Sequence, residues 1–393
     1  MGSPKLRFKD EDGKEFPEWV KRDLGNITDI NPKNERLPEE FIYIDLESVK
    51  DGRLLNEHKI RLENAPSRAQ RFLKKNDILF QTVRPYQKNN LFFTKDGIYV
   101  ASTGYSQIRT KDNPRFIYQT LFTDRFVNNV MIRCTGTSFP AIDAGSLAEI
   151  KIYLPSLPEQ TKIANFLSAI DDRITHINKK LDLLKTYKKG MMQKIFSQEI
   201  RFKDENGKEF SDWKMKKLGD ICVTFSGGTP SVANRSFYEG NIPFIRSGDI
   251  YKTHADIYIS EIGLKNSSAK LVKKGDLLYA LYGATSGETS ISKINGAINQ
   301  AILCIRSEFL NLSYLENLLS FKKREIIGTY LQGGQGNLSA EIIKSLIFYF
   351  PSLPEQTKIA NFLSAIDDKI TLVEKQLAAT KTYKKGLMQQ LFI

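Results

Sequence analysis

The hydrophobic pattern of this chain is strongest in two long stretches that begin at Pro155 and Pro351. In each stretch one face is marked by alternating steps of four and three residues, the spacing of a helix that packs against another helix. The positions of this seam are Ile163, Leu167, Ile170, Ile174, Ile177, Leu181, Leu184, Lys188, Met191 and Ile195, then Ile359, Leu363, Ile366, Ile370, Val373, Leu377, Thr380, Lys384, Leu387 and Leu391. Neither helix can bury its stripe alone, and the chain must return between them. We therefore expect two long antiparallel helices paired as a coiled coil.

Both stretches are parts of an internal repeat. Residues 155–172 and 351–368 carry the same 18 residues, PSLPEQTKIANFLSAIDD, and the sequence KTYKKG follows in both. A shorter segment, RFKDEDGKEFPEW at 7–19, recurs at 201–213 with ten of thirteen positions unchanged. The chain is therefore a tandem duplication of a leader, a variable region and a long helix.

Each long helix carries a start signal. Ser156 is followed three residues later by Glu159, and Ser352 by Glu355. This spacing predicts a capping box, in which the serine side chain and the glutamate side chain bond to each other's backbone N–H groups.

The two variable regions, about 20–150 and 214–350, follow one plan with different residues. A turn that enters an apolar strand contains Asp77 in the first region and Asp276 in the second. The later parts of the plan are a second strand pattern at 90–102 and 288–298, an amphipathic helix at 114–126 and 309–327, a loop of small residues at 135–140 and 332–337, and a last strand before each proline. The expected fold class is α/β (α+β), with two α/β domains separated by the helix pair. The expected boundaries are 1–154 and 200–350 for the domains, and 155–199 and 351–393 for the helices.

The net charge of the chain indicates a candidate binding partner. The chain of 393 residues has a net charge of +13, with 20 basic and 16 acidic residues in 20–150 and 16 basic and 11 acidic in 214–350. Two moderately basic modules favour nucleic acid as the partner, although simple solubility would also explain the charge. The three cysteines are far apart, and no apolar run reaches membrane-spanning length, so a cytoplasmic protein is expected.

Catalytic motifs are missing from the sequence. The glycine-rich runs at 227–229 and 283–288 lack the lysine of a P-loop and are interpreted as turns or close-approach loops. The three histidines are isolated, and no His, Cys or carboxylate cluster has metal-ligand spacing. The adjacent carboxylates Asp171 and Asp172, with their copies Asp367 and Asp368, are interpreted as solvated or interfacial. We expect no catalysis and no metal site in this chain.

Taken together, the chain resembles the specificity subunit of type I restriction-modification systems. The residues that carry the resemblance are the twin Leu-Pro-Glu-Gln helix entries, the repeated run that ends in two aspartates, Lys217–Ile221, Ile242–Asp249 and Gly333–Asn337. The first region departs most from the family pattern, because it has no Arg-Ser-Gly-Asp run. Ile42–Leu46 occupies a similar place.

The resemblance implies a division of labour. Each target-recognition domain would read one half of a bipartite double-stranded DNA target, and the helices would set the gap and dock two modification subunits. Those methyltransferase partners would bind S-adenosylmethionine, and restriction subunits, the motor-nuclease, would use ATP and Mg. This chain would hold no cofactor.

Polar residues on loops are the candidates for DNA contact, since Arg, Gln, Asn and small hydroxyl side chains match the groups in the major groove. They are Arg84, Tyr86, Gln87, Lys88, Tyr105, Gln107, Thr137 and Ser138 in the first domain, and Arg246, Ser247, Tyr282, Thr285, Ser286 and Gln335 in the second. Alternatives stay open for three of them. Tyr282 fits a core position, Arg246 can pair with Asp249, and Lys88 suits a phosphate better than a base.

Two other functions are compatible with parts of this pattern. A non-catalytic coiled-coil scaffold that binds proteins at both ends would show no salt-sensitive DNA binding. A single-chain restriction enzyme would need methylase and nuclease motifs, which the sequence lacks.

Overall fold

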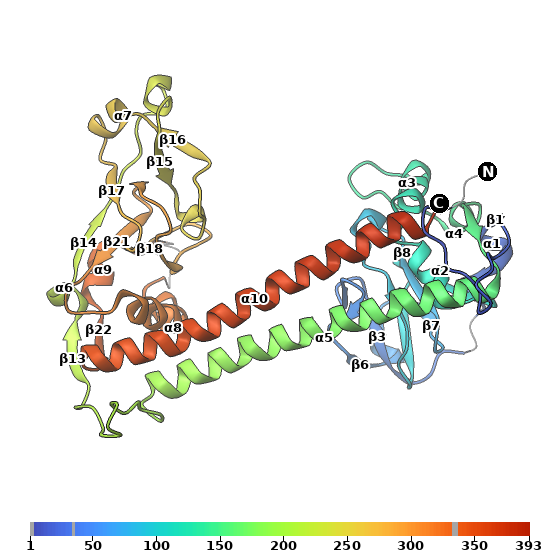
Figure 1. Ribbon diagram of the computed structural model, residues 1–393, viewed down its shortest axis with the longest axis horizontal. Coiled ribbons are helices and arrows are strands. Elements are labelled where there is room, and N and C mark those ends of the chain that lie inside the picture. Colours follow the sequence, from blue (N-terminus) through green and yellow to red (C-terminus); the bar gives the residue numbers. More distant parts are fainter. Residues whose placement is uncertain (1–3, 34–35, 332–336) are drawn as a thin grey trace. The chain divides into compact units, whose positions relative to one another are not determined.

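The computed structural model describes residues 4–33, 36–331 and 337–393, which form two compact units. The first unit consists of 1–178 and 375–393, and the second of 179–374. The two long helices, α5 (Leu157–Phe196) and α10 (Leu353–Leu391), each contribute one segment to either unit (Figure 1). Every unit is thus one variable region together with a segment of both helices.

The described part of the first variable region is built from short strands with four small α-helices and two 3-10 helices. Its elements are β1 (Val20–Asp23), α1 (Leu24–Ile27), β2 (Thr28–Ile30), β3 (Glu40–Ile44), β4 (Val49–Lys50), β5 (Arg53–Leu54), β6 (His58–Arg61), η1 (Leu62–Asn64), β7 (Ala69–Phe72), β8 (Ile78–Gln81), η2 (Pro85–Gln87), β9 (Leu91–Phe92), β10 (Tyr99–Ser102), β11 (Tyr105–Thr110), α2 (Pro114–Thr120), α3 (Asp124–Arg133), α4 (Ala144–Ala148) and β12 (Lys151–Leu154). The strands form sheets in the orders β1-β12, β6-β3-β10-β7, β2-β11-β8-β9 and β4-β5.

The second variable region repeats this topology. Its elements are β13 (Lys214–Lys217), α6 (Leu218–Ile221), β14 (Val223–Ser226), η3 (Arg235–Tyr238), β15 (Ile242–Ile245), η4 (Ser247–Asp249), β16 (Ile257–Ile259), α7 (Glu261–Lys265), β17 (Lys270–Val272), β18 (Leu277–Ala280), β19 (Thr289–Ile291), β20 (Gly296–Ile298), β21 (Ile302–Arg306), α8 (Leu312–Tyr330), α9 (Ala340–Ser345) and β22 (Ile347–Phe350). Its sheets are β13-β22, β16-β15-β20-β17 and β14-β21-β18-β19. Among the strands of the described residues, each region has one parallel pair, and the two pairs join equivalent strands, β3 with β10 and β15 with β20.

The predicted fold class is confirmed: two mixed α and β domains are duplicated, and the long helices pack together. Within the second unit α5 and α10 run antiparallel, because Lys185 pairs with Glu374 and the later Lys188 pairs with the earlier Asp367. Every predicted seam position is buried or half-buried. No described helix is long and apolar enough to cross a membrane.

The two lysines of the seam form ion pairs across it. Lys188 reaches Asp367 at 2.7 Å in the second unit, and Lys384 reaches Asp171 at 2.6 Å in the first. The first carboxylate of each repeated aspartate pair therefore lies at the interface between the helices. The sequence predicts either a solvated or an interfacial position. Because both partners are repeated, the duplication builds the same bridge twice.

The predicted capping boxes are wrong. The Ser156 and Ser352 hydroxyls make no hydrogen bond within the described chain. Glu159, which has no exposed surface, instead forms two hydrogen bonds with the guanidinium of Arg7, at 3.0 and 2.7 Å. Glu355 binds Arg201 of the second leader in the same way. The leader segments supply a stronger charged partner than the backbone N–H groups of the helix start.

The glutamine beside each of these glutamates ties the long helix to its domain. Gln160 Nε2 donates to Pro155 O at 2.9 Å, and its Oε1 accepts from Asn113 N, the residue that caps α2. Gln356 makes the same two contacts with Pro351 and Asn311, the cap of α8. The repeated Pro-Glu-Gln entry thus anchors leader, domain and helix to one another.

Two local predictions also need correction. The stretch 90–102 forms two strands in different sheets, β9 and β10, because the chain turns at Gly97, whose φ is +125°. The stretch 288–298 is divided in the same way into β19 and β20. The helix expected over 114–126 is two helices, since Thr123 caps the start of α3.

Candidate nucleic-acid interface

The sequence-predicted loops of the first domain come together beside the end of β8. Arg84 N donates to Pro140 O at 2.7 Å, and a bridge joins Val83 to Ala141. This contact places η2 next to the small-residue loop 135–141, which is closed by hydrogen bonds between Thr135 and Ala141. Thr137 and Ser138 are exposed on that loop, and Tyr86 and Gln87 are exposed on η2.

Arg84 is held at the centre of this group by an aromatic ring that the sequence analysis missed. Its guanidinium carbon lies 4.3 Å from the ring centroid of Phe139, whose side chain is 63% exposed. A cation over an aromatic face is attracted by the ring quadrupole, and a flat contact restricts the guanidinium. The sequence signal that could have identified Phe139 is an aromatic residue next to Pro140 in a loop of small residues.

Lys88 is more restricted than the sequence suggested. Its Nζ donates to Asp124 Oδ1 and to Phe122 O, both at 3.0 Å. The hydrogen bond from Lys88 lowers the pKa of Asp124 below its ordinary value. This lysine joins η2 to α3.

Tyr105 and Gln107 lie in the interior of the domain. Both have 0% exposed surface, and burial raises the pKa of the Tyr105 hydroxyl. Gln107 Nε2 donates to Phe72 O at 2.8 Å and to Asp77 Oδ2 at 2.6 Å. Both residues lie on β11, a central strand on which Ser106 and Ile108 are also buried, so both faces of the strand are covered. Tyr105 and Gln107 are therefore left out of the proposed DNA contacts.

In the second domain the equivalent loop follows β18. Tyr282 is half-buried and bridges to Asn337, as Val83 bridges to Ala141. Ser286 Oγ donates to Leu281 O at 3.1 Å, and Thr285 O accepts from Glu288 N at 2.9 Å. The loop is therefore a closed turn with Thr285 and Ser286 half-buried on it. Gln335 lies outside the described residues.

The two loops differ at the positions that need a left-handed backbone. Arg84 and Lys88 have φ values of +53° and +55°, and the second copy has Gly283 and Gly287 there, at +88° and +77°. Glycine takes this conformation without the clash that a Cβ causes, whereas an arginine or lysine is strained by it. The first domain keeps two charged side chains at positions where the shared backbone favours glycine.

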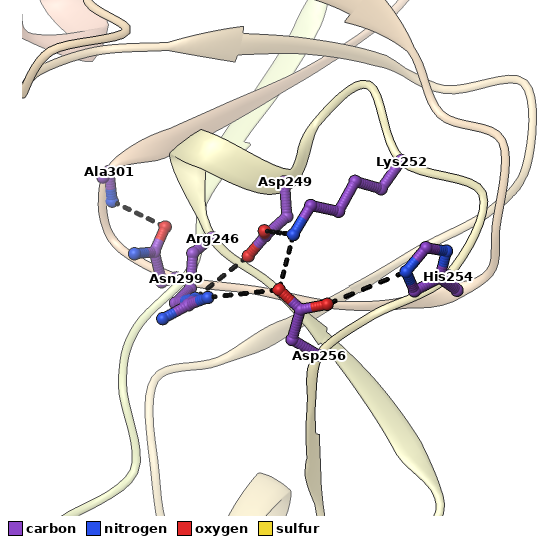
Figure 2. Close-up of polar contacts among 7 residues, drawn as sticks. All are labelled: Arg246, Asp249, Lys252, His254, Asp256, Asn299 and Ala301. Atoms are coloured by element: carbon purple, nitrogen blue, oxygen red, sulfur yellow. Dashed lines mark hydrogen bonds and ion pairs between the residues drawn. The ribbon is translucent and has the colours of Figure 1, made fainter. Parts of the chain in front are cut away.

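Arg246 is at the centre of a charged network in the second domain (Figure 2). Its Nε donates to Asp249 Oδ2 at 2.9 Å, so the pairing with Asp249 anticipated from the sequence is confirmed. Its Nη2 lies 3.9 Å from Asp256 Oδ2, and Lys252 Nζ lies 2.8 Å from Asp249 Oδ1. The Arg246 side chain is still 45% exposed, and Ser247 next to it is half-buried.

Asp249 remains ionised in this setting. Burial by itself would raise its pKa, but hydrogen bonds from Lys252 and Arg246 outweigh burial and hold the pKa below its ordinary value. The carboxylate thus holds the guanidinium through its Nε atom. No group of described residues is arranged to hold a metal ion.

The duplicated architecture agrees with the protein family that the chain is similar to. The family model "Type I restriction modification DNA specificity domain" matches the chain twice, over residues 17–186 and 210–381. Each match covers one variable region and most of the long helix that follows it.

Similar relatives occur in Methanocaldococcus jannaschii and Haemophilus influenzae. The chain is 24% identical over 416 residues to the MjaIX specificity subunit of Methanocaldococcus jannaschii, covering 98% of this chain and 95% of that protein. It is 30% identical over 263 residues to the putative MjaX specificity subunit of the same organism, covering 64% and 60%. It is also 25% identical to the HindI specificity subunit of Haemophilus influenzae, covering 77% and 85%.

Solved structures share the fold. The S subunit of a type I restriction-modification system from M. genitalium superposes with a TM-score of 0.63 at 17% identity, covering 100% of this chain and 99% of that one. A chain from a structure of the assembly and conformational transition of a type I R-M system gives 0.56 at 23% identity, covering 96% and 97%.

Proposed function

This chain belongs to the type I restriction-modification DNA specificity family, and from that premise we propose that each of its two units reads one half of a bipartite DNA target. The chain is the DNA specificity subunit of such a system, which is not the catalytic subunit. The observation that carries the proposal is the repeated scaffold with different loops. The buried contacts made by Glu159 and Gln160 recur at Glu355 and Gln356, whereas the exposed loop residues do not recur.

We propose a set of DNA contacts on these loops. In the first unit it comprises Arg84, Tyr86, Gln87, Thr137 and Ser138, with Phe139 added as the support of Arg84. In the second unit it comprises Arg246, Ser247, Tyr282, Thr285, Ser286 and Gln335. Lys88 is assigned to a phosphate or to the support of η2, because its ammonium already binds Asp124.

The helices have a second role in this proposal. The paired seams set the length of the unread gap, and their exposed faces dock two modification subunits. Those subunits bind S-adenosylmethionine and methylate adenine, and the restriction subunits use ATP and Mg to cleave. The chain supplies sequence recognition to that assembly, which we place in the cytoplasm.

Exchange of one recognition region tests the proposal. The full chain with residues 214–350 replaced by the corresponding region of a relative is expressed with its modification subunit, and the methylated sequences are mapped. We expect one half of the target to change and the other half to stay. Exchange of 20–150 is the matched control and should change the opposite half.

Two results would contradict this division. Alteration of both halves by either exchange would show that the units do not read separately. A lack of salt-sensitive DNA binding by the chain would instead favour a scaffold that binds proteins.

A further inference from the structure

In each domain one residue directly follows the first strand of the parallel pair, and this residue is negatively charged in one domain and positively charged in the other. In the first, Ile44 is the register partner of Ala101, and Asp45 follows it. In the second, Ile245 is the register partner of Ile298, and Arg246 follows it. The two isoleucines are both almost fully buried, with 0% and 2% exposure, so the strands are in equivalent positions. Asp45 and Arg246 are therefore the same position of the fold.

Both side chains are held by the residue three places further on. Asp45 Oδ1 accepts hydrogen bonds from Ser48 N at 2.8 Å and Ser48 Oγ at 2.7 Å. Arg246 is held by Asp249, which is 6% exposed. Each side chain is thus fixed before any ligand binds, which lowers the entropy lost on recognition.

The neighbouring strand offers a matching polar residue in both domains. Ser102 Oγ accepts from Gly104 N at 3.1 Å, and Asn299 Oδ1 accepts from Ala301 N at 3.2 Å. Figure 2 shows Asn299 beside Arg246. The same small site is therefore built twice at the carboxyl ends of two parallel strands, with a carboxylate in one copy and a guanidinium in the other.

The charge difference is not required by the fold. Where the scaffold needs a buried carboxylate, both copies have it: Asp77 binds Arg109 and Asp276 binds Arg306, each through two hydrogen bonds of 2.6 to 2.8 Å. A position that differs between the copies, while the strands around it keep the same register, is free to serve recognition.

We propose that this position determines base specificity in both units. The Arg246 guanidinium donates to O6 and N7 of a guanine, and the Asp45 carboxylate accepts from the exocyclic amine of a cytosine. Asp249 and Asp256 are positioning residues, which orient Arg246 without touching the base. The inference rests on the proposed function, since it names the bases at one site of each unit.

Mapping of the methylated target tests it with conservative variants of the full chain and its modification subunit. We expect Arg246→Gln to lose preference for one guanine, about 10- to 100-fold, in one half of the target, because glutamine suits adenine instead. Asp45→Asn should lose preference for one cytosine in the other half by a similar factor. Asp96→Asn and Lys344→Gln, which break exposed ion pairs elsewhere, are the matched controls and should change nothing.

The outcomes separate this inference from the function it rests on. If the unaltered chain directs no bipartite methylation, the proposed function fails. If it does, and both variants keep the discrimination of the unaltered chain at every base, the inference is overturned. Arg246→Lys guards against misfolding, since it keeps the charge beside Asp249 but cannot bond a guanine through a planar fork. Lysine can still bond guanine O6 and N7, so this variant should retain more guanine preference than Arg246→Gln, and the reverse order would also overturn the inference.

Discussion

At the scale of single residues, the two domains share a backbone conformation but carry different side chains on it. Arg84 occupies a left-handed position that the second copy fills with Gly283. Its guanidinium packs on Phe139, which offsets part of the strain. A strained residue whose charge is presented by an exposed ring is better explained by recognition than by folding.

Replacement of Arg84 separates these effects. We expect Arg84→Gly to be more stable than Arg84→Ala by about 1 kcal/mol, because only glycine relieves the left-handed backbone. Both variants should lose about 1–3 kcal/mol of discrimination at one base pair. Thermal unfolding and binding to matched and mismatched duplexes measure the two quantities.

Asn76 provides the control for this pair. It also has a positive φ, +73°, where the second copy has Gly275, but it lies outside the loop cluster. Asn76→Gly should leave discrimination unchanged. Equal stabilities for the two Arg84 variants would show that its backbone is not strained.

At the scale of elements, the long helices are specified by a repeated apolar seam that contains a lysine at the same position of both copies. The Lys188–Asp367 bridge is partly screened from solvent, with side-chain exposures of 22% and 47%. The nearby Lys185–Glu374 bridge is more open, at 54% and 48%. The Coulomb attraction within an ion pair grows as the pair is withdrawn from water, the desolvation of both charges opposes it, and loss of one partner leaves an uncompensated charge.

Charge reversal measures the contribution of the seam bridge. We expect Lys188→Asp to destabilise the protein by about 1–2 kcal/mol, since it places two carboxylates together. Combination with Asp367→Lys should recover about 0.5–1 kcal/mol as coupling in a double-mutant cycle. The same cycle on Lys185 and Glu374 is the control, with an expected coupling of at most about 0.5 kcal/mol. A control coupling as large as that of the seam bridge would assign no special role to the seam lysine.

At the scale of the whole molecule, each long helix is shared between the two units. The division falls after Asn178 in α5 and after Glu374 in α10. The pairs Asp171–Lys384 and Lys188–Asp367 lie wholly inside one unit each. Residues added at both divisions would therefore leave the pairing within each unit intact.

Paired insertion tests whether the helices set the gap. Four helix-forming residues after both Asn178 and Glu374 add about 6 Å of rise. Since one base-pair step is about 3.4 Å, we expect the same two half-targets separated by one or two more base pairs. Methylation mapping reads the gap directly. Active methylation with an unchanged gap would show that the spacing is set elsewhere.

Insertion into α5 alone is the matched control. It shifts one helix against the other, so the bridges within the two units can no longer form together in register. We expect this variant to be less stable than the paired insertion. If both insertion variants unfold at the same temperature, the register of the two helices does not contribute to the stability of the protein.

The sequence by itself determined the duplication, the two α/β domains, the helix seam and the family. These follow from periodicity and repetition, which are properties of local stretches and need no knowledge of distant contacts. Tertiary structure alone decided which polar residues face outward. Tyr105 and Gln107 are typical contact residues by type, yet a central strand buries them.

The structure likewise decided which distant residues act together. Glu159 binds Arg7 across 152 positions of sequence instead of capping its own helix, and Phe139 supports Arg84 from another loop. The sequence places Ile42–Leu46 in a position similar to Ile242–Asp249, but it is the strand register that aligns Asp45 with Arg246. A one-dimensional pattern predicts faces of elements, whereas contacts between elements depend on how the sheets bring separate segments together.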